Sequence, residues 1–143
     1  MIQEIIKKWE ENKYKLEEYF RTTKQENYCS YEAIVKKIFE LVINNDKDSY
    51  ERFSIDRMTV IDDGDYQGTQ IFIIPKDTYQ PSIYDYLITH TYYGSCSGCD
   101  VLEGIRNYDG DLPTDQKVKE YMILALHLVQ KMKRIADDEQ DWL

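Results

Sequence analysis

The chain has 143 residues, of which 42% are hydrophobic and 13% aromatic, and it carries a formal net charge of −9. A chain of this length forms one domain and buries enough surface to fold without disulfides or a metal ion. The charge argues against binding to duplex nucleic acid, whose phosphates require basic side chains. A basic surface on another protein is the complementary kind of partner.

The sequence also predicts where the protein is found. It contains no apolar run long enough to span a bilayer. Residues 1–8 lack the order of basic, apolar and small residues that a secretory signal has. Three cysteines are an odd number, which argues against a secreted scaffold held by disulfides. We therefore expect a cytoplasmic protein with no membrane contact.

Two amphipathic helices are expected within residues 1–45. The first covers residues 2–20, and its apolar stripe consists of Ile2, Ile5, Ile6, Trp9, Leu16 and Phe20. Ser30 is placed to cap the second helix, which ends near residues 44–45. The second stripe consists of Tyr31, Ile34, Val35, Ile38, Phe39, Leu41 and Val42.

The middle of the chain, residues 57–94, changes to the composition of strands. Residues 58–61, 69–74 and 86–93 are rich in β-branched and aromatic side chains. The loop between the first two runs contains Gly64 and Gly68, which is typical of a hairpin. These runs predict a three-stranded antiparallel meander.

A short helix or turn follows over residues 101–105, then a loop over 107–113 and a long C-terminal helix over 114–137, capped by Thr114. The apolar arc of this last helix is broad, so we expect it to contact both the sheet and another helix. The arc consists of Val118, Tyr121, Met122, Ala125, Leu126, Leu128, Val129, Met132 and Ile135. The predicted fold is therefore a single α+β domain, with the meander packed against two to three helices.

Residues 94–100, with the sequence GSCSGCD, lie between the third strand and the short helix. A Cys-x-x-Cys pair at a helix N-terminus suits thiol redox chemistry, because the helix dipole lowers the pKa of the first thiol. In that alternative Cys96 is the attacking thiolate and Cys99 is the resolving cysteine. Two observations argue against it. The βαβ pattern of thioredoxin-like proteins is missing, and the negative charge of Asp100 disfavours a thiolate.

The same two cysteines could form half of a zinc site, which needs four ligands. Cys29 and His90 are the leading candidates to complete the set with Cys96 and Cys99. Asp100 and His127 are further candidates, but His127 is expected to be exposed on the polar face of the last helix. This alternative implies a zinc-stabilised interaction module.

Residues 94–98 also have the letters of a nucleophile elbow centred on Cys96, but the sheet is too small for such a hydrolase and no base is marked. The favoured interpretation is structural, because glycines allow a tight bend and small cysteines pack well when buried. We therefore expect no catalytic residue and no cofactor.

Two acidic loops, residues 62–68 and 107–113, fail as calcium sites because apolar or uncharged residues occupy the ligand positions. Several tyrosines surround the first loop and the cysteine segment, either as part of the core or as a binding patch. The expected binding residues are Asp62, Asp63, Asp65, Tyr66, Ser95, Ser97 and Asp100.

Residues 92–102, with the sequence YYGSCSGCDVL, resemble a motif in small uncharacterised proteins of bacteriophages and prophages. Residues 64–69 and 122–130 are similar to further segments of these proteins, so that the resemblance covers the second half of the chain. It implies an accessory protein that acts in the host cytoplasm by occupying a host protein, in some cases at its nucleic-acid-binding groove. With the charge, this predicts a non-enzymatic binding protein that inhibits a basic, nucleic-acid-binding defence component. The thiol-redox enzyme and the zinc module stay open as alternatives.

Overall fold

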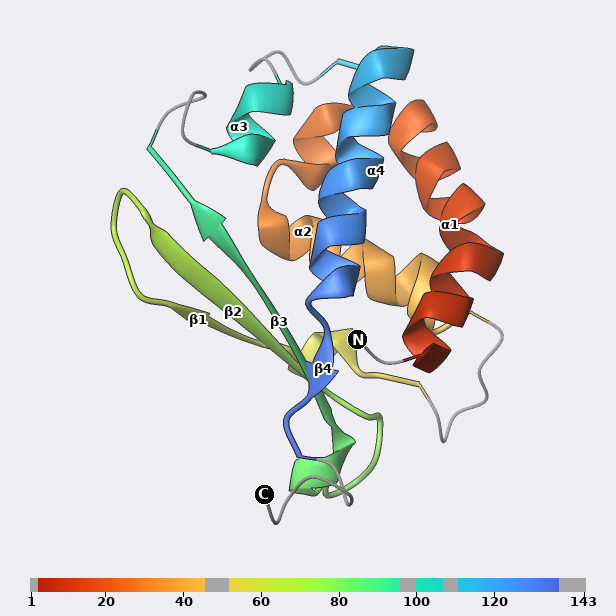
Figure 1. The fold of residues 1–143 in the computed structure, drawn as a ribbon, viewed down its shortest axis with the longest axis vertical. Helices are drawn as coiled ribbons and strands as arrows, with labels where there is room; N and C mark the ends of the chain where they lie inside the picture. The colour runs from red at the N-terminus through yellow and green to blue at the C-terminus, as the bar shows by residue number, and fades with distance from the viewer. Residues whose placement is uncertain (1–2, 46–51, 96–99, 107–110, 137–143) are drawn as a thin grey trace.

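The computed structural model describes residues 3–45, 52–95, 100–106 and 111–136. The fold is α+β, and Figure 1 shows the α-helices on one side of an antiparallel sheet. The elements are α1 (Gln3–Thr22), α2 (Tyr31–Ile38), β1 (Thr59–Asp62), β2 (Gly68–Pro75), β3 (Tyr86–Tyr93), α3 (Val101–Arg106), α4 (Asp115–Gln130) and β4 (Lys133–Arg134). None of the helices in these ranges is both long and apolar enough to cross a membrane.

The two N-terminal helices form where the apolar stripes predict them. The α1 helix buries Ile5, Trp9, Leu16 and Phe20. Ser30 caps α2 as expected, since its side chain accepts a hydrogen bond from the Ala33 amide at 3.1 Å. A π-helix, Phe39–Ile43, continues α2 and completes the predicted second stripe.

The buried amide of Asn44 joins this helix end to the chain that leads into the sheet. Asn44 Nδ2 donates to the Phe53 carbonyl at 2.9 Å, and the Phe53 amide donates to Asn44 Oδ1 at 2.8 Å. A single side chain thus satisfies both backbone groups of a buried residue, as a neighbouring strand would.

The sheet has the strand order β1-β2-β3-β4, with antiparallel pairs throughout. The first three strands form the predicted meander. Side chains alternate between the two faces of a strand, and Phe72, Ile74 and Leu87 point toward the helices and are buried. Three short 3-10 helices flank these elements, at Gln25–Tyr28, Ile55–Arg57 and Ile83–Asp85.

The last helix is shorter than predicted. Thr114 caps α4 as expected, accepting from the Lys117 amide at 3.3 Å, and α4 contacts α1, α2, α3 and β3. However, α4 ends at Gln130 and not near residue 137. The amide of Lys131 bonds back to the His127 carbonyl at 3.3 Å, and the chain leaves the helix there.

The chain that follows α4 forms a fourth strand, so the prediction of three strands was wrong. Arg134 of β4 pairs with Leu87 of β3, and the Ile135 amide donates to the Tyr86 carbonyl at 3.2 Å. The edge of β3 offers unpaired backbone groups whose hydrogen bonds replace those of a continued helix. Ile135, which the longer helix would have placed in the apolar arc, is 46% exposed.

Aromatic rings fill the core between α1 and α4. The Phe20 ring lies 4.9 Å from that of Tyr28 and 5.3 Å from that of Tyr121, between centroids. The Tyr28 hydroxyl is 2.9 Å from the Phe20 carbonyl, and the Tyr121 hydroxyl donates to Gln25 Oε1 at 2.6 Å. These buried phenols therefore keep hydrogen-bond partners, as buried polar groups must.

Candidate binding site

The hydroxyl of Tyr93 connects the β1–β2 hairpin to the end of β3. It donates to Asp62 Oδ1 at 2.5 Å. The same carboxylate accepts from the Gly64 amide at 3.0 Å and from Gln70 Nε2 at 3.2 Å. These donors lower the pKa of Asp62, the Tyr93 hydrogen bond most of all, and the bond to Asp62 raises the pKa of Tyr93 to about 12. Asp62 is therefore ionised at neutral pH while Tyr93 stays a donor.

The loop between β1 and β2 is held in its conformation by contacts within the loop itself. Asp63 Oδ1 accepts from the Thr69 amide at 2.7 Å. Gly64 and Gly68 approach each other so closely that a Cβ on Gly64 would lie 2.0 Å from the Gln67 carbonyl oxygen. Side chains at either glycine are therefore excluded by the close backbone contact.

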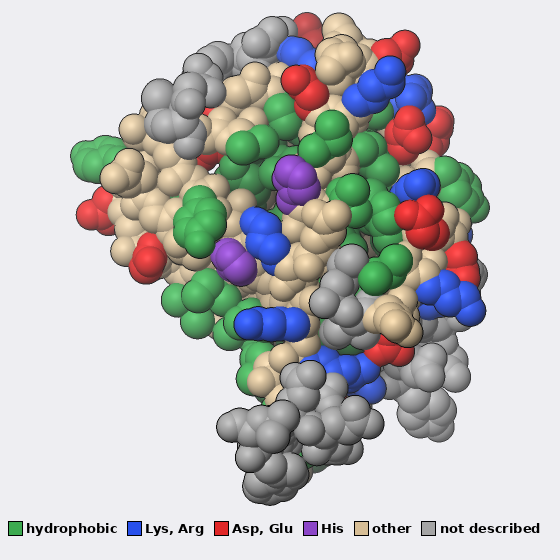
Figure 2. All heavy atoms as spheres, viewed as in Figure 1, with side chains coloured by type: hydrophobic (Ala, Val, Ile, Leu, Met, Phe, Trp, Pro, Cys, Tyr) green, Lys and Arg blue, Asp and Glu red, His purple; other side chains and the backbone are tan. Residues whose placement is uncertain are grey.

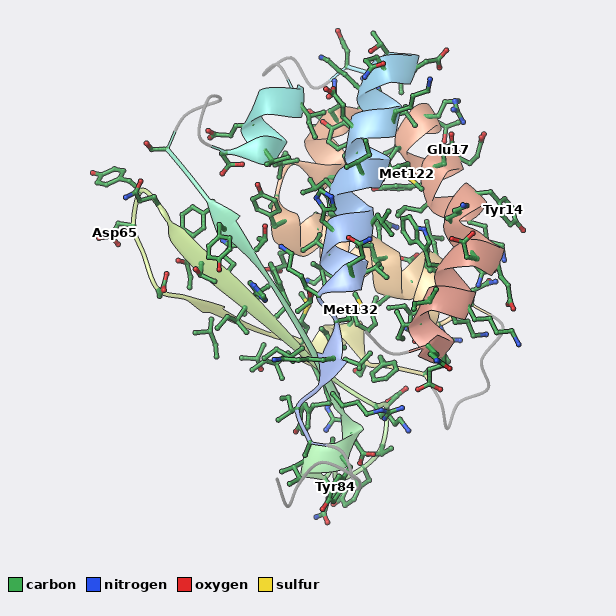
Figure 3. All side chains as sticks on the ribbon, in the orientation of Figure 1. Tyr14, Glu17, Asp65, Tyr84, Met122 and Met132 are labelled. Atoms are coloured by element: carbon green, nitrogen blue, oxygen red, sulfur yellow. The ribbon has the colours of Figure 1, made fainter. Side chains whose placement is uncertain are left out.

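Two of the predicted binding residues project from this braced loop. Asp65 points away from the body of the protein at the loop tip (Figure 3), and Tyr66 is 82% exposed. The aromatic patch considered from the sequence is exposed in part, since Tyr92 is 69% exposed. The loop therefore presents a carboxylate and a phenol on a backbone that Asp62 and Asp63 hold.

Replacing Tyr93 with phenylalanine tests the link between the hairpin and β3. Because the folded state raises the pKa of Tyr93, its contribution to stability is complete below the unfolded pKa of about 10 and is lost as the pH rises toward about 12. Because the pKa of Asp62 is lowered, the contribution of Asp62 is present above its ordinary value and is lost as the pH falls through the folded pKa.

Urea unfolding of the wild type and of Tyr93→Phe, at pH values from neutral to alkaline, measures this contribution. We expect the stability difference between the two proteins to be constant up to about pH 10 and to shrink above it. A difference that keeps its size throughout the alkaline range would contradict the hydrogen bond.

Asp100 anchors both ends of the cysteine segment. Its Oδ1 accepts from the Tyr31 hydroxyl at 2.7 Å and from the Leu102 amide at 3.0 Å, and its Oδ2 accepts from the Gly94 amide at 2.9 Å. The Glu103 amide lies 3.3 Å from Oδ1, so that Asp100 also caps α3. Asp100 is 7% exposed, and its carboxylate lies inside the structure rather than on the expected outer surface.

A polar cavity of about 190 Å³ lies beside this carboxylate. It lies between the start of α2, the start of β2, the end of β3 and α3, and its lining residues include Cys29, Tyr31, Gln70, Tyr93 and Glu103. Glu103 Oε2 is buried and receives no hydrogen bond from the residues that the structure describes. Burial raises the pKa of Tyr31, so its phenol remains protonated and can donate to Asp100.

His90 and Cys29, two candidate ligands of the zinc alternative, lie on different sides of the sheet. His90 belongs to the sheet face opposite the helices, since its neighbours Thr89 and Thr91 point inward and are buried, and it contacts Tyr92 edge to face. Cys29 lies on the helix side, in the cavity beside Asp100. His90 therefore cannot complete a site with Cys29.

The other members of the predicted set lie partly outside the described residues. Cys96, Ser97 and Cys99 belong to residues 96–99, whereas Ser95 is described and exposed. His127 is exposed on α4, as expected. Within the described ranges, no group of three or more His, Cys, Asp or Glu side chains is placed to hold a metal ion. The redox and zinc alternatives thus depend on residues 96–99.

A second, more apolar hollow of about 360 Å³ lies between α3 and α4. Val101 and Ile123 line it and are 61% and 54% exposed. Glu120 and His127 also line it. Its lining is more apolar than that of the cavity beside Asp100.

Sequence reasoning missed Tyr31 and Glu103 as members of the site, and it considered Tyr93 only as one of the tyrosines around the hairpin and the cysteine segment. The spacing from Asp100 to Glu103 is that of a helix capping pair, which could have indicated the capping role of Asp100. Tyr93 carries no local signal, because its partner Asp62 is 31 positions away in the sequence.

Comparisons with known proteins identify no relative. No family model, no curated protein and no solved structure matches the chain.

Proposed function

We propose that this chain is a phage-type accessory protein that binds a host protein through the β1–β2 loop and the adjoining end of β3. It acts in the host cytoplasm without a cofactor. Its target is a nucleic-acid-binding defence protein, which the bound chain inhibits by covering a basic groove.

The observation that supports this proposal is the braced loop. The carboxylates of Asp62 and Asp63 accept hydrogen bonds from backbone amides of the loop and so hold its conformation. Asp65 and Tyr66 project from the loop (Figure 3). A preorganised loop loses little conformational entropy when it binds. Exposed tyrosine is among the residues that contribute most to protein interfaces.

Charge supports the choice of target. Residues 58–75 contain three aspartates and no lysine or arginine, so the hairpin presents negative charge alone. A surface that binds nucleic acid is positively charged because it neutralises phosphates. Complementary potentials of this kind speed association and select the partner.

A capture experiment with host lysate and mass spectrometry tests the proposal. The wild-type chain should recover a nucleic-acid-binding protein, and added DNA or RNA should release it by competition for the same groove. The variant Asp63→Lys/Asp65→Lys should recover it at least roughly tenfold less, because two attractive charges become repulsive and the loop loses the hydrogen bond from the Thr69 amide to Asp63. Cys96→Ser should recover it as the wild type does.

The matched control is Glu26→Lys/Asp56→Lys, which changes the net charge equally at exposed positions away from the loop. Equal loss in both variants would show that overall charge, rather than the loop, attracts the partner. Recovery of nothing specific, or retention of the target by the loop variant, would contradict the proposal.

A further inference from the structure

In the part of the chain that the structure describes, the helices leave one face of the sheet uncovered (Figure 1). The α-helices lie on the side of Phe72, Ile74 and Leu87 (Figure 1). Side chains alternate along a strand, so a second set points the other way. This set, the outer sheet face, consists of Thr59, Ile61, Thr69, Ile71, Ile73, Pro75, Tyr86, Ile88, His90, Tyr92 and Lys133, of which Pro75 is buried.

Isoleucines form the centre of the outer sheet face. Ile61 pairs with Ile71, and Ile73 pairs with Ile88. Ile61 is 46% exposed, while Ile71, Ile73 and Ile88 are half-buried. Neighbouring isoleucines on three strands make a continuous apolar surface, and such surfaces on a folded protein mark a contact with another molecule.

The charge of this face differs from that of the rest of the chain. None of its eleven side chains is acidic, although the chain contains 27 Asp and Glu residues. Its charged groups lie at the β4 edge, where Lys133 is exposed and Lys131 Nζ donates to the His90 carbonyl at 3.1 Å. Figure 2 shows histidine and Lys or Arg side chains beside hydrophobic ones in this region.

We propose that a second copy of this chain covers the outer sheet face, forming a dimer by stacking of the two sheets. Two chains of charge −9 repel each other wherever carboxylates would be opposed, as they would along α1 or at the hairpin loop. The outer sheet face is where copies meet without that repulsion. It is also self-complementary, as a two-fold interface requires, because the Ile73–Ile88 pair of one copy meets the same pair of the other.

The sheet geometry accommodates the lysines of such a dimer. Stacked sheets pack with their strands nearly aligned. A two-fold axis along the strands places the β4 edge of one copy over the β1 edge of the other. Each Lys133 then faces the neighbourhood of Thr59, and the two lysines stay about 14 Å apart across three strand spacings.

Sedimentation equilibrium of the wild-type chain, with a reducing agent to exclude disulfides, tests this inference. The mass should rise toward that of two chains with concentration and should stay there at high salt, because the contact is apolar. Ile71→Thr keeps a β-branched residue at the centre of the face. It should raise the dissociation constant roughly tenfold or more while the circular dichroism spectrum stays unchanged.

Ile123→Thr is the matched control, since Ile123 is 54% exposed on α4 and lies outside the face. It should dimerise as the wild type does. A wild-type chain that stays monomeric at millimolar concentration would overturn the inference. So would an unchanged dissociation constant in Ile71→Thr, or an equal loss in Ile123→Thr. The result is independent of partner capture, which uses the hairpin loop.

Discussion

Replacing Asp100 with alanine should lower the free energy of unfolding by about 3 kcal/mol. The substitution removes the acceptor of four hydrogen bonds, including those of the buried Tyr31 hydroxyl and Leu102 amide. A buried donor without a partner costs more than the net value of the bond that it loses. Loss of the cap also weakens the start of α3. Urea unfolding measures the change.

Tyr31→Phe separates the parts of this effect, because it removes one hydroxyl and leaves the carboxylate with its amide donors. We expect about 1 kcal/mol for this variant. Hydrogen exchange should show loss of protection at the Gly94 amide in Asp100→Ala alone, whereas the Leu102 amide also donates to the Tyr31 hydroxyl at 3.2 Å and so depends on both side chains. An Asp100→Ala protein as stable as the wild type would show that the carboxylate does not hold the cysteine segment.

Replacing Phe20 with alanine should cost about 3–5 kcal/mol, which is a large part of the stability of a domain of this size. The Phe20 ring is fully buried and lies between Tyr28 and Tyr121. Its removal leaves a cavity between α1 and α4 that the neighbouring rings, held by their hydroxyl hydrogen bonds, cannot fill.

Tyr14→Ala is the control on the same helix. Tyr14 is 61% exposed and points away from the core (Figure 3), so its loss should change the free energy of unfolding by no more than about 0.5 kcal/mol. Equal destabilisation by the two substitutions, compared in urea at the same pH, would contradict the packing of α1 on α4.

The candidate site could be predicted in part. The acidic hairpin was visible in the sequence, because aspartates and glycines between two β-branched runs predict a turn. The role of Asp100 was not. Its carboxylate faces Tyr31, 69 positions earlier in the chain, and only the packing of α2 beside the end of β3 brings the two together. The separation of His90 from Cys29 likewise follows from the assembled sheet.

The sequence by itself determined the helices and strands that depend on periodicity and on neighbouring residues. Apolar spacing placed α1, α2 and the first three strands, and Ser30 and Thr114 act on amides three residues away. The tertiary structure alone decided where α4 ends, because β3 offers an edge whose hydrogen bonds compete with those of the helix. It also decided which isoleucines are covered, since that depends on which sheet face the helices occupy.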